Sequence, residues 1–168
     1  MRKFLTLLLL FTLMACQSES QKRNPLKEVQ LETPKGELIR TSIMYTDEEQ
    51  MKGLSGTQES DYDADQGMLF FYKESGEKNF WMPDTYFDLD LFYLDDQLKI
   101  LDIVRKLPHY IGRNNPDLIP RARAVWCRHT LEMKSTSQIA QGLKIGDQLK
   151  WISSLDLAET EKQLKTKD

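Results

Sequence analysis

Short apolar segments separated by polar turns fill the centre of this chain, and they constrain its fold more than any other feature. Such segments run over residues 68–72, 79–82, 90–94 and 98–104, with polar connections at residues 73–78 and 95–97. Short strands joined in this way are typical of antiparallel hairpins. The chain has 168 residues, of which 40% are hydrophobic, so it can bury one modest core. The sequence therefore predicts an α+β fold: a single compact β-rich domain of mostly antiparallel strands with one or two short helices.

The flanking regions extend the predicted domain to residues 27–152. Two strand-like segments, at residues 28–32 and 37–45, are separated by a turn that contains Pro34 and Gly36. Thr46 can cap a short helix, because Glu49 follows at the spacing of a capping box. The remaining predicted parts are a long connection over residues 105–121, a strand over 122–133, a helical turn or two over 137–143, a closing strand over 149–152, and a polar C-terminal tail over 153–168 that is a weak helix or a frayed end.

The N-terminus has the features of an export signal. Arg2 and Lys3 precede an uncharged run over residues 4–14, which is too short to span a bilayer because a span takes about 20 apolar residues. The run ends in Leu13-Met14-Ala15-Cys16, which resembles the lipobox of bacterial lipoproteins. The resemblance implies a lipoprotein signal peptide over residues 1–15, lipidation of Cys16, and a lipidated tether over residues 16–26. The alternative is an ordinary secretory signal with a chance cysteine.

A lipidated Cys16 predicts an exported, membrane-anchored lipoprotein of the cell envelope. If the source is Gram-negative, Gln17 in place of Asp points to the outer membrane or the periplasmic face. The formal net charge of −3 argues against a uniformly basic nucleic-acid binder. The expected partners are therefore the membrane, through Cys16, and an anionic envelope component or a protein, and not a nucleic acid.

Five ordered strings carry a resemblance to a known family. They are MKGLSG (51–56), GMLFFY (67–72), FWMPDTYFDLDLFYLD (80–95), LEM (131–133) and GLKIGD (142–147). Their order and spacing resemble the bacterial domain-of-unknown-function family 192 over about residues 36–152. The resemblance implies a small β-rich α+β domain that is often exported, with no established activity and no established catalytic residues.

The chain departs from the usual pattern of that family at a few positions. Pro83 and Asp84 replace a Lys-Asn pair, Asp88 stands where Pro is usual, and Thr57 stands near an expected Arg. These departures concentrate in the string that carries most of the polar residues.

That string supplies candidate ligand-binding and catalytic residues, namely Trp81, Asp84, Thr85, Asp88 and Asp90. Asp88 and Asp90 are two residues apart, so in an extended strand their carboxylates leave one face and can bind a cation or act as acid and base. The alternative is structural: Asp84 and Thr85 hold a turn, and Asp90 pairs with an arginine. The aromatic residues Phe80, Trp81 and Phe92 are expected in the core.

Cys127 and His129 form a second weak catalytic candidate. Their two-residue spacing predicts one strand face, where a histidine base can activate a thiol. Glu132 lies nearby, and His109 in the long connection is a ligand-binding candidate. The alternative is a purely structural role, in which Cys127 is a buried free thiol that packs as a small hydrophobic side chain. The histidines and the cysteine do not have the sequence spacing of a known metal site, so neither a metal nor a cofactor is expected.

Opposite charges gather in two segments. The net charge is −6 over residues 46–65 and +5 over residues 105–128. Arginine forks suit carboxylates and phosphates, so Arg113, Arg121 and Arg123 are predicted to bind an anion. The alternative is that the two segments pair with each other or are simply solvated.

These observations favour a non-enzymatic role. The leading hypothesis is a lipid-anchored cell-envelope protein of unknown activity that binds an anionic ligand or envelope partner. The rival is a small hydrolase or transferase that uses Cys127 and His129, or the cluster of Asp84, Asp88 and Asp90. A purely structural envelope protein is a third class, and it predicts no pocket.

Overall fold

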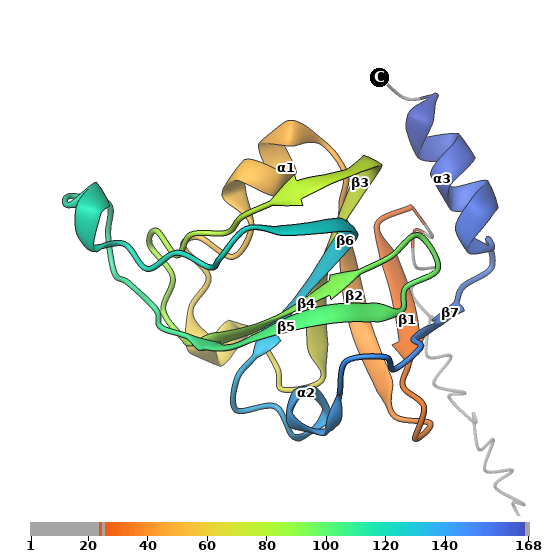
Figure 1. Ribbon diagram of the computed structural model, residues 1–168, viewed down its shortest axis with the longest axis horizontal. Coiled ribbons are helices and arrows are strands. Elements are labelled where there is room, and N and C mark those ends of the chain that lie inside the picture. The colour runs from red at the N-terminus through yellow and green to blue at the C-terminus, as the bar shows by residue number, and fades with distance from the viewer. Residues whose placement is uncertain (1–23, 25, 167–168) are drawn as a thin grey trace, which may run out of the picture.

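The structure is a computed structural model that describes residue 24 and residues 26–166. The predicted signal peptide, Cys16 and most of the tether lie outside these residues. The described elements are β1 (Glu28–Glu32), β2 (Leu38–Met44), α1 (Asp47–Lys52), β3 (Gln66–Lys78), β4 (Leu89–Leu94), β5 (Ile100–Leu107), β6 (Val125–Lys134), α2 (Gln138–Gly142), β7 (Lys150–Ile152) and α3 (Leu157–Lys165), with single 3-10 turns at Glu59–Asp61 and Pro116–Leu118. Figure 1 shows them arranged around one curled sheet.

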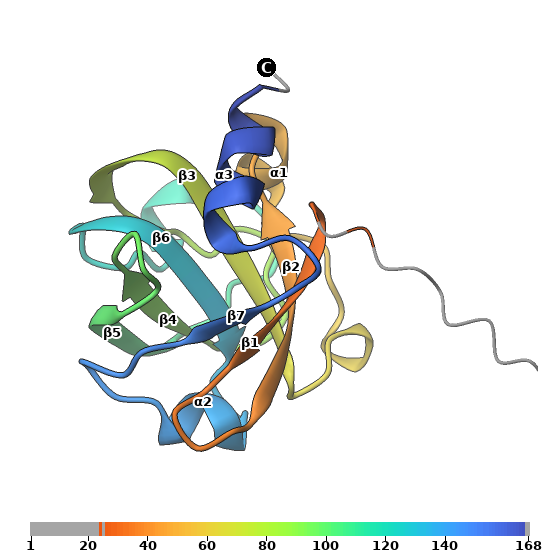
Figure 2. The same ribbon diagram turned by 90° about the vertical axis from the view of Figure 1, so that its right-hand side faces the viewer.

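The sheet has seven strands in the order β5-β4-β6-β3-β2-β1-β7. Five of its six strand pairs in the described chain are antiparallel, and β2 and β3 are parallel. The parallel pair follows from the long connection through α1, since a short hairpin joins only antiparallel strands. The two ends of the sheet meet where Ile100 N–H donates to the Asp147 carbonyl at 2.9 Å and Leu149 N–H donates to the Leu98 carbonyl at 3.2 Å. The sheet is therefore strongly curled (Figure 2).

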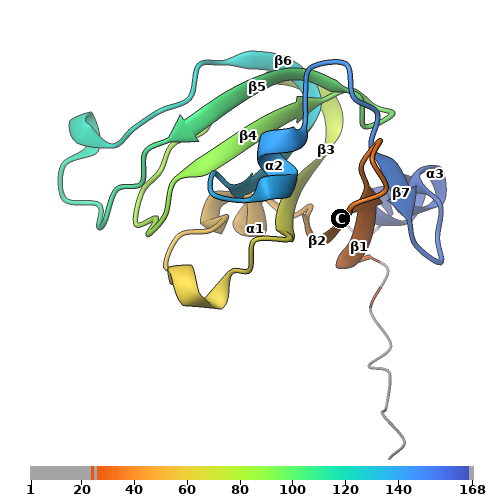
Figure 3. The ribbon, with the colours of Figure 1, turned by 90° about the horizontal axis from the view of Figure 1, so that it is seen from below.

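Each face of the sheet carries its own apolar cluster. The first cluster gathers side chains of β1, β2 and β6 with Ala140 of α2 and Leu164 of α3. Gly67 of β3 lies here because a Cβ at this position would approach Leu131 to 2.8 Å and Ile39 to 2.9 Å. The second cluster joins β3 and β4 to Leu54, just after α1, and to the aromatic segment over residues 80–87. Helix α2 packs on the first cluster and the turn after α1 on the second; Figure 3 shows both helices from below. The second face carries the candidate site.

Most of the predicted elements are confirmed, including the single, mostly antiparallel β-rich domain. Thr46 accepts a hydrogen bond from Glu49 N–H and Glu49 reaches back to Thr46 N–H, which is the predicted capping box of α1. The C-terminal tail contains a third short helix, α3, whose side chain at Leu164 is buried and whose Glu161 pairs with Arg128. Among the described residues, no helix is both long enough and apolar enough to span a membrane.

The predicted hairpin over residues 68–82 is wrong. Strand β3 continues without a turn to Lys78 because its second half pairs with the start of β6, with Gly76 opposite Cys127 and Lys78 opposite Val125. The following residues 79–82 are not a strand partner of β3, and Trp81 forms only an isolated bridge to Arg121. This displaced segment becomes one wall of a cavity.

Candidate functional site

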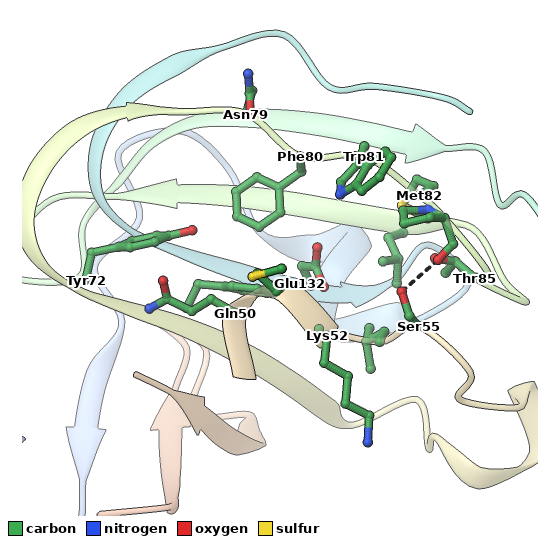
Figure 4. Close-up of a pocket in the computed structure, with 16 residues that line it drawn as sticks. Gln50, Lys52, Ser55, Tyr72, Asn79, Phe80, Trp81, Met82, Thr85 and Glu132 are labelled. Carbon is green, nitrogen blue, oxygen red and sulfur yellow. Dashed lines mark hydrogen bonds between the residues drawn. The ribbon is translucent and has the colours of Figure 1, made fainter. Parts of the chain in front are cut away.

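A cavity of about 120 Å³ opens on the second face of the sheet. Helix α1 and the turn after it form one wall, residues 79–85 form the opposite wall, and β6 lies at its base (Figure 4). The lining side chains that bear on its chemistry are those of Gln50, Lys52, Ser55, Tyr72, Phe80, Trp81, Met82, Thr85 and Glu132.

The turn after α1 positions the first wall. Gly53 ends the helix at φ +47, a left-handed conformation that glycine adopts without strain, and a Cβ there would lie 3.2 Å from the Phe70 ring. Two hydrogen bonds then join the turn to the opposite wall. Ser55 Oγ donates to the Pro83 carbonyl at 2.7 Å, and Gly56 N–H donates to the Asp84 carbonyl at 2.8 Å. The two walls are therefore fixed relative to one another.

The long connection after β5 holds the second wall from outside. Backbone hydrogen bonds of 2.8–3.1 Å join the wall to it, from Ala122 to Phe80, Met82 to Pro120, Asp84 to Gly112, and Thr85 to Tyr110. Asp84 adopts φ 53, and it can do so because Asp and Asn tolerate the left-handed region better than other side chains. Asp84 Oδ1 also accepts from Gly112 N–H at 3.3 Å.

Glu132 of β6 lies at the base of the cavity and is 4% exposed. Its neighbours across the sheet are Met68 and Leu91, both apolar. Tyr62 donates to the Glu132 main-chain carbonyl at 3.5 Å, but no hydrogen bond or ion pair engages the side-chain carboxyl within the described chain. Burial raises the pKa of Glu132 from 4.5 to about 8, because the charged form loses its hydration. At neutral pH, the cavity therefore has a protonated carboxyl at its base.

Aromatic rings enclose the space above Glu132. Phe80 is buried and meets Phe70 edge-on, with ring centroids 4.9 Å apart. Tyr72 and Phe80 line the cavity together with Glu132 (Figure 4). Trp81 is 43% exposed, so its expected place in the core is wrong, and the Arg121 guanidinium lies 5.1 Å from its ring centroid.

Asp88 and Asp90 are occupied in holding the long connection. Asp90 is buried, pairs with Arg105 at 2.5 Å and accepts from Lys106 N–H at 2.8 Å. Asp88 accepts from the backbone N–H of His109 at 2.9 Å and contacts its ring nitrogen at 2.6 Å. Partial burial opposes ionisation of Asp88, but these hydrogen bonds lower its pKa below the usual range. The expected pairing of Asp90 with an arginine is confirmed, and neither carboxylate lines the cavity.

Cys127 and His129 do not share a strand face, and that prediction is wrong. Cys127 lies in the second apolar cluster, with its Sγ 3.7 Å from Thr130 Oγ1. His129 stacks on Phe71 of the first cluster, at a centroid distance of 4.2 Å. The β3–β6 register shifts at this point, so the regular alternation fails.

The protonation states of this pair also differ from those of a thiolate and its base. Burial raises the pKa of the Cys127 thiol. Burial, together with Arg128 and Lys78, lowers the pKa of His129 to about 3, while His129 Nδ1 accepts from Tyr72 N–H at 3.3 Å. Within the described part of the chain, no three His, Cys, Asp or Glu side chains gather as metal ligands.

The two charged segments pair with other parts of the chain. The acidic segment is engaged by Arg40, which binds Asp63 and Asp65, and by Lys27, which binds Glu49. In the basic segment, carboxylates engage Arg105, Arg123 (through Asp102 at 2.6 Å) and Arg128. Arg113 and Arg121 have no carboxylate partner among the residues that the structure describes.

The structure thus brings two of the predicted ligand-binding residues, Trp81 and Thr85, to the cavity. Asp84, Asp88, Asp90, His109, Arg113, Arg121 and Arg123 lie outside its lining. Gln50, Ser55 and Glu132 were not among the predicted ligand-binding residues. The signal for Glu132 was present as a lone charged residue between Leu131 and Met133 of an apolar strand.

Two solved structures share the fold. A protein of Sinorhizobium meliloti 1021, named as a candidate transcription regulator, and a protein of unknown function from Novosphingobium aromaticivorans DSM 12444 are each 22% identical to the chain, with TM-scores of 0.58. Each match covers 74% of this chain, and it covers 92% of the first protein and 84% of the second. No curated protein matches the chain.

The family profile described as "DUF192: Uncharacterized ACR" matches residues 29–151, which include every element from β2 to β6, both walls of the cavity and Glu132. The chain belongs to this family of uncharacterised proteins, DUF192.

Proposed function

We propose that this protein is a ligand-binding module of the cell envelope, and that the cavity between α1 and residues 79–85 is its binding site. The observation that carries the proposal is the buried Glu132 carboxyl, which has no partner in the described chain and lies at the base of the cavity. Among the described residues the one fully buried side-chain atom without a partner is Arg128 Nε, so the Glu132 carboxyl opens into the cavity, where a polar ligand can supply the partner that its burial calls for. A purely structural domain gains nothing from it.

The walls of the cavity support the same proposal. Small-molecule sites combine apolar and aromatic walls with a few placed polar groups, and this cavity has Phe80 and Trp81 beside the polar side chains of Gln50 and Glu132. Hydrogen bonds hold both walls in place without a ligand, so little ordering is needed on binding.

A fragment screen tests this proposal. Small aromatic and polar fragments are added to the 15N-labelled protein, and hits are followed by NMR chemical shifts. We expect hits that shift the resonances of Gln50, Ser55 and the Trp81 indole. The substitution Trp81→Ala should weaken them at least tenfold. The matched control is Trp126→Ala, because Trp126 is 70% exposed and lies outside the cavity lining. A complete screen without a hit at the cavity, or hits indifferent to Trp81→Ala, would contradict the proposal.

We propose in addition that Cys16 anchors the module to a membrane. The support is the string Leu13-Met14-Ala15-Cys16 at the end of an apolar run, followed by a polar stretch that precedes β1. Replacement Cys16→Ser should release the protein from the membrane fraction and abolish incorporation of labelled palmitate. Retention of Cys16→Ser in the membrane fraction would contradict the lipid anchor.

A second candidate is a partner that docks on the long connection after β5. Arg113 and Arg121 are exposed without a carboxylate partner in the described chain, and Ile111 and Leu118 are exposed nearby in the sequence. Exposed apolar side chains beside arginines are typical of an interface.

The docking candidate is tested with soluble Cys16→Ser protein and an isolated envelope fraction. The double change Arg113→Glu and Arg121→Glu should abolish cosedimentation, and Lys144→Glu, an exposed cation outside this connection, should not. Equal cosedimentation of the three proteins would contradict it.

A further inference from the structure

Some side-chain donors of the proposed binding site are already used, whereas the Asn79 amide, the Trp81 indole N–H and the Lys52 ammonium, which also line it, have no acceptor among the described residues. The hydroxyls of Ser55 and Thr85 both donate to the Pro83 carbonyl, at 2.7 and 3.4 Å. The Gln50 amide nitrogen donates to the carbonyls of Met44 and Phe71, at 3.2 and 3.3 Å. Among the described residues no donor engages the Gln50 carbonyl oxygen, and Figure 4 shows it turned toward Tyr72. This oxygen and the Glu132 carboxyl are acceptors that a ligand with proton donors can meet.

The carboxyl at the base has no cation of the protein to balance it when it ionises. Lys52 lines the cavity, but Figure 4 shows its ammonium pointing away from Glu132. Arg121 is exposed and lies over the Trp81 ring at 5.1 Å from its centroid, and Lys78 lies over the Tyr72 ring at 3.8 Å from its centroid. Charges at the exposed rim act through water and are weakened, whereas Glu132 acts in a poorly hydrated space. A cationic ligand supplies the missing partner.

The aromatic walls favour the same class of ligand. The faces of aromatic rings attract cations, and Tyr72 and Trp81 already do so with Lys78 and Arg121. The aromatic side chains of Tyr72, Phe80 and Trp81 line the same cavity as the Glu132 carboxyl, a combination that suits an ammonium group on an apolar body. A metal ion is a poorer fit, since Glu132 has no second carboxylate, thiolate or imidazole beside it in the described chain.

Resting on the proposed function, we infer that the cavity binds a small primary or secondary ammonium compound, whose charged nitrogen pairs with Glu132 and whose apolar body lies between Phe80 and Trp81. The ammonium proton donors meet the Glu132 carboxylate and the Gln50 carbonyl oxygen. On binding, Glu132 gives up its proton to solvent, and the ligand cation takes the place of that proton.

This exchange makes binding depend on pH in one direction. Glu132 is protonated at pH 6 and must ionise to pair with the cation, so affinity rises as the pH approaches 8. The other groups that face it do not titrate in this range, because burial raises the pKa of Tyr62, Tyr72, Tyr93 and the Cys127 thiol. The ammonium of Lys52 points away from Glu132 (Figure 4).

The test compares benzylamine with benzyl alcohol, which has the same ring but no charge, by calorimetry on the folded full chain. At pH 8 the protein should bind benzylamine at least tenfold more tightly than benzyl alcohol, and the affinity for benzylamine should fall roughly fiftyfold between pH 8 and pH 6, as the ionised fraction of Glu132 does. In Glu132→Gln, an isosteric change whose folding is checked by circular dichroism, the two probes should bind equally.

The outcomes separate this inference from the proposed function. Equal binding of both probes at every pH, or a preference that persists in Glu132→Gln, overturns the ammonium class while cavity binding stands. The pH profile of the unsubstituted protein decides alone if Glu132→Gln does not fold. If neither probe binds and Trp81→Ala changes nothing, the cavity is not a binding site and both proposals fall.

Discussion

Replacing Glu132 by Gln is expected to remove a loss of stability that Glu132 causes as the pH rises above about 5. In the unfolded chain Glu132 loses its proton near its ordinary pKa of 4.5, and in the folded protein it keeps the proton until about pH 8. Between these values the folded state holds one proton more than the unfolded state, so a rise in pH favours unfolding. The Gln side chain does not titrate, so the variant lacks this contribution.

The magnitude follows from the pKa difference. Each pH unit is worth roughly 1.4 kcal/mol, so the stability of the unsubstituted protein relative to Glu132→Gln should fall by about 5 kcal/mol between pH 4.5 and pH 8. That amount is comparable to the whole stability of a marginal domain. Solvent screening does not reduce this free-energy difference, because the Glu132 side chain is only 4% exposed.

Urea unfolding followed by tryptophan fluorescence measures this difference at half-unit steps from pH 4.5 to pH 9. Glu77→Gln is the matched control, since Glu77 occupies an exposed position of β3. We expect the control to run parallel to the unsubstituted protein. If Glu132→Gln ran parallel as well, so that the difference stayed constant with pH, the reasoning that burial keeps Glu132 protonated would be refuted.

Three further predictions concern the other titrating and paired groups. His129 is held neutral in the fold with a pKa near 3, so stability relative to His129→Gln should fall by roughly 1.4 kcal/mol per unit as the pH drops below 6.5; a flat difference in urea unfolding would contradict this. Asp90→Asn should cost about 3 kcal/mol because it leaves Arg105 without its buried partner, whereas Asp88→Asn at a half-exposed pair should cost less than about 1 kcal/mol. Equal losses in thermal unfolding would show that burial does not separate them. Cys127 should react with a thiol reagent only after unfolding, and rapid labelling of its peptide in the native protein, seen by mass spectrometry, would revive a reactive thiol.

Local patterns correctly predict the β1–β2 and β4–β5 hairpins, whereas the predicted hairpin over residues 68–82 is wrong. The hairpin of β1 and β2 forms around the turn at residues 33–36, and that of β4 and β5 forms around residues 95–99, because both pairings join neighbours in sequence. The segment after β3 has the same apolar character, yet its backbone pairs with residues 110–122, which lie far along the chain. Non-local pairing of this kind has no local signature.

In the candidate site, too, residues that share a local pattern were predicted, and residues placed by distant contacts were not. Trp81 and Thr85 were found because one string concentrates aromatic and polar side chains. Asp88 and Asp90 were found by the same reasoning, but their carboxylates hold the long connection instead of lining the cavity. Glu132 was passed over as a site residue, since both faces of β6 are buried and no alternation distinguishes its side chain.

The sequence by itself determined the elements that depend on neighbours along the chain: the capped helix α1, the hairpin turns, the short strands and the strings that identify the family. Only the tertiary structure decided which carboxylates are paired and which one is buried without a partner. The pairing of β4 with β5 brings Arg105 to Asp90, and the path of the long connection brings Arg123 to Asp102. Glu132, by contrast, has only apolar neighbours across the sheet. The physical reason is that hydration and Coulomb interactions depend on distances in space, and these are set by contacts between residues that the chain order keeps apart.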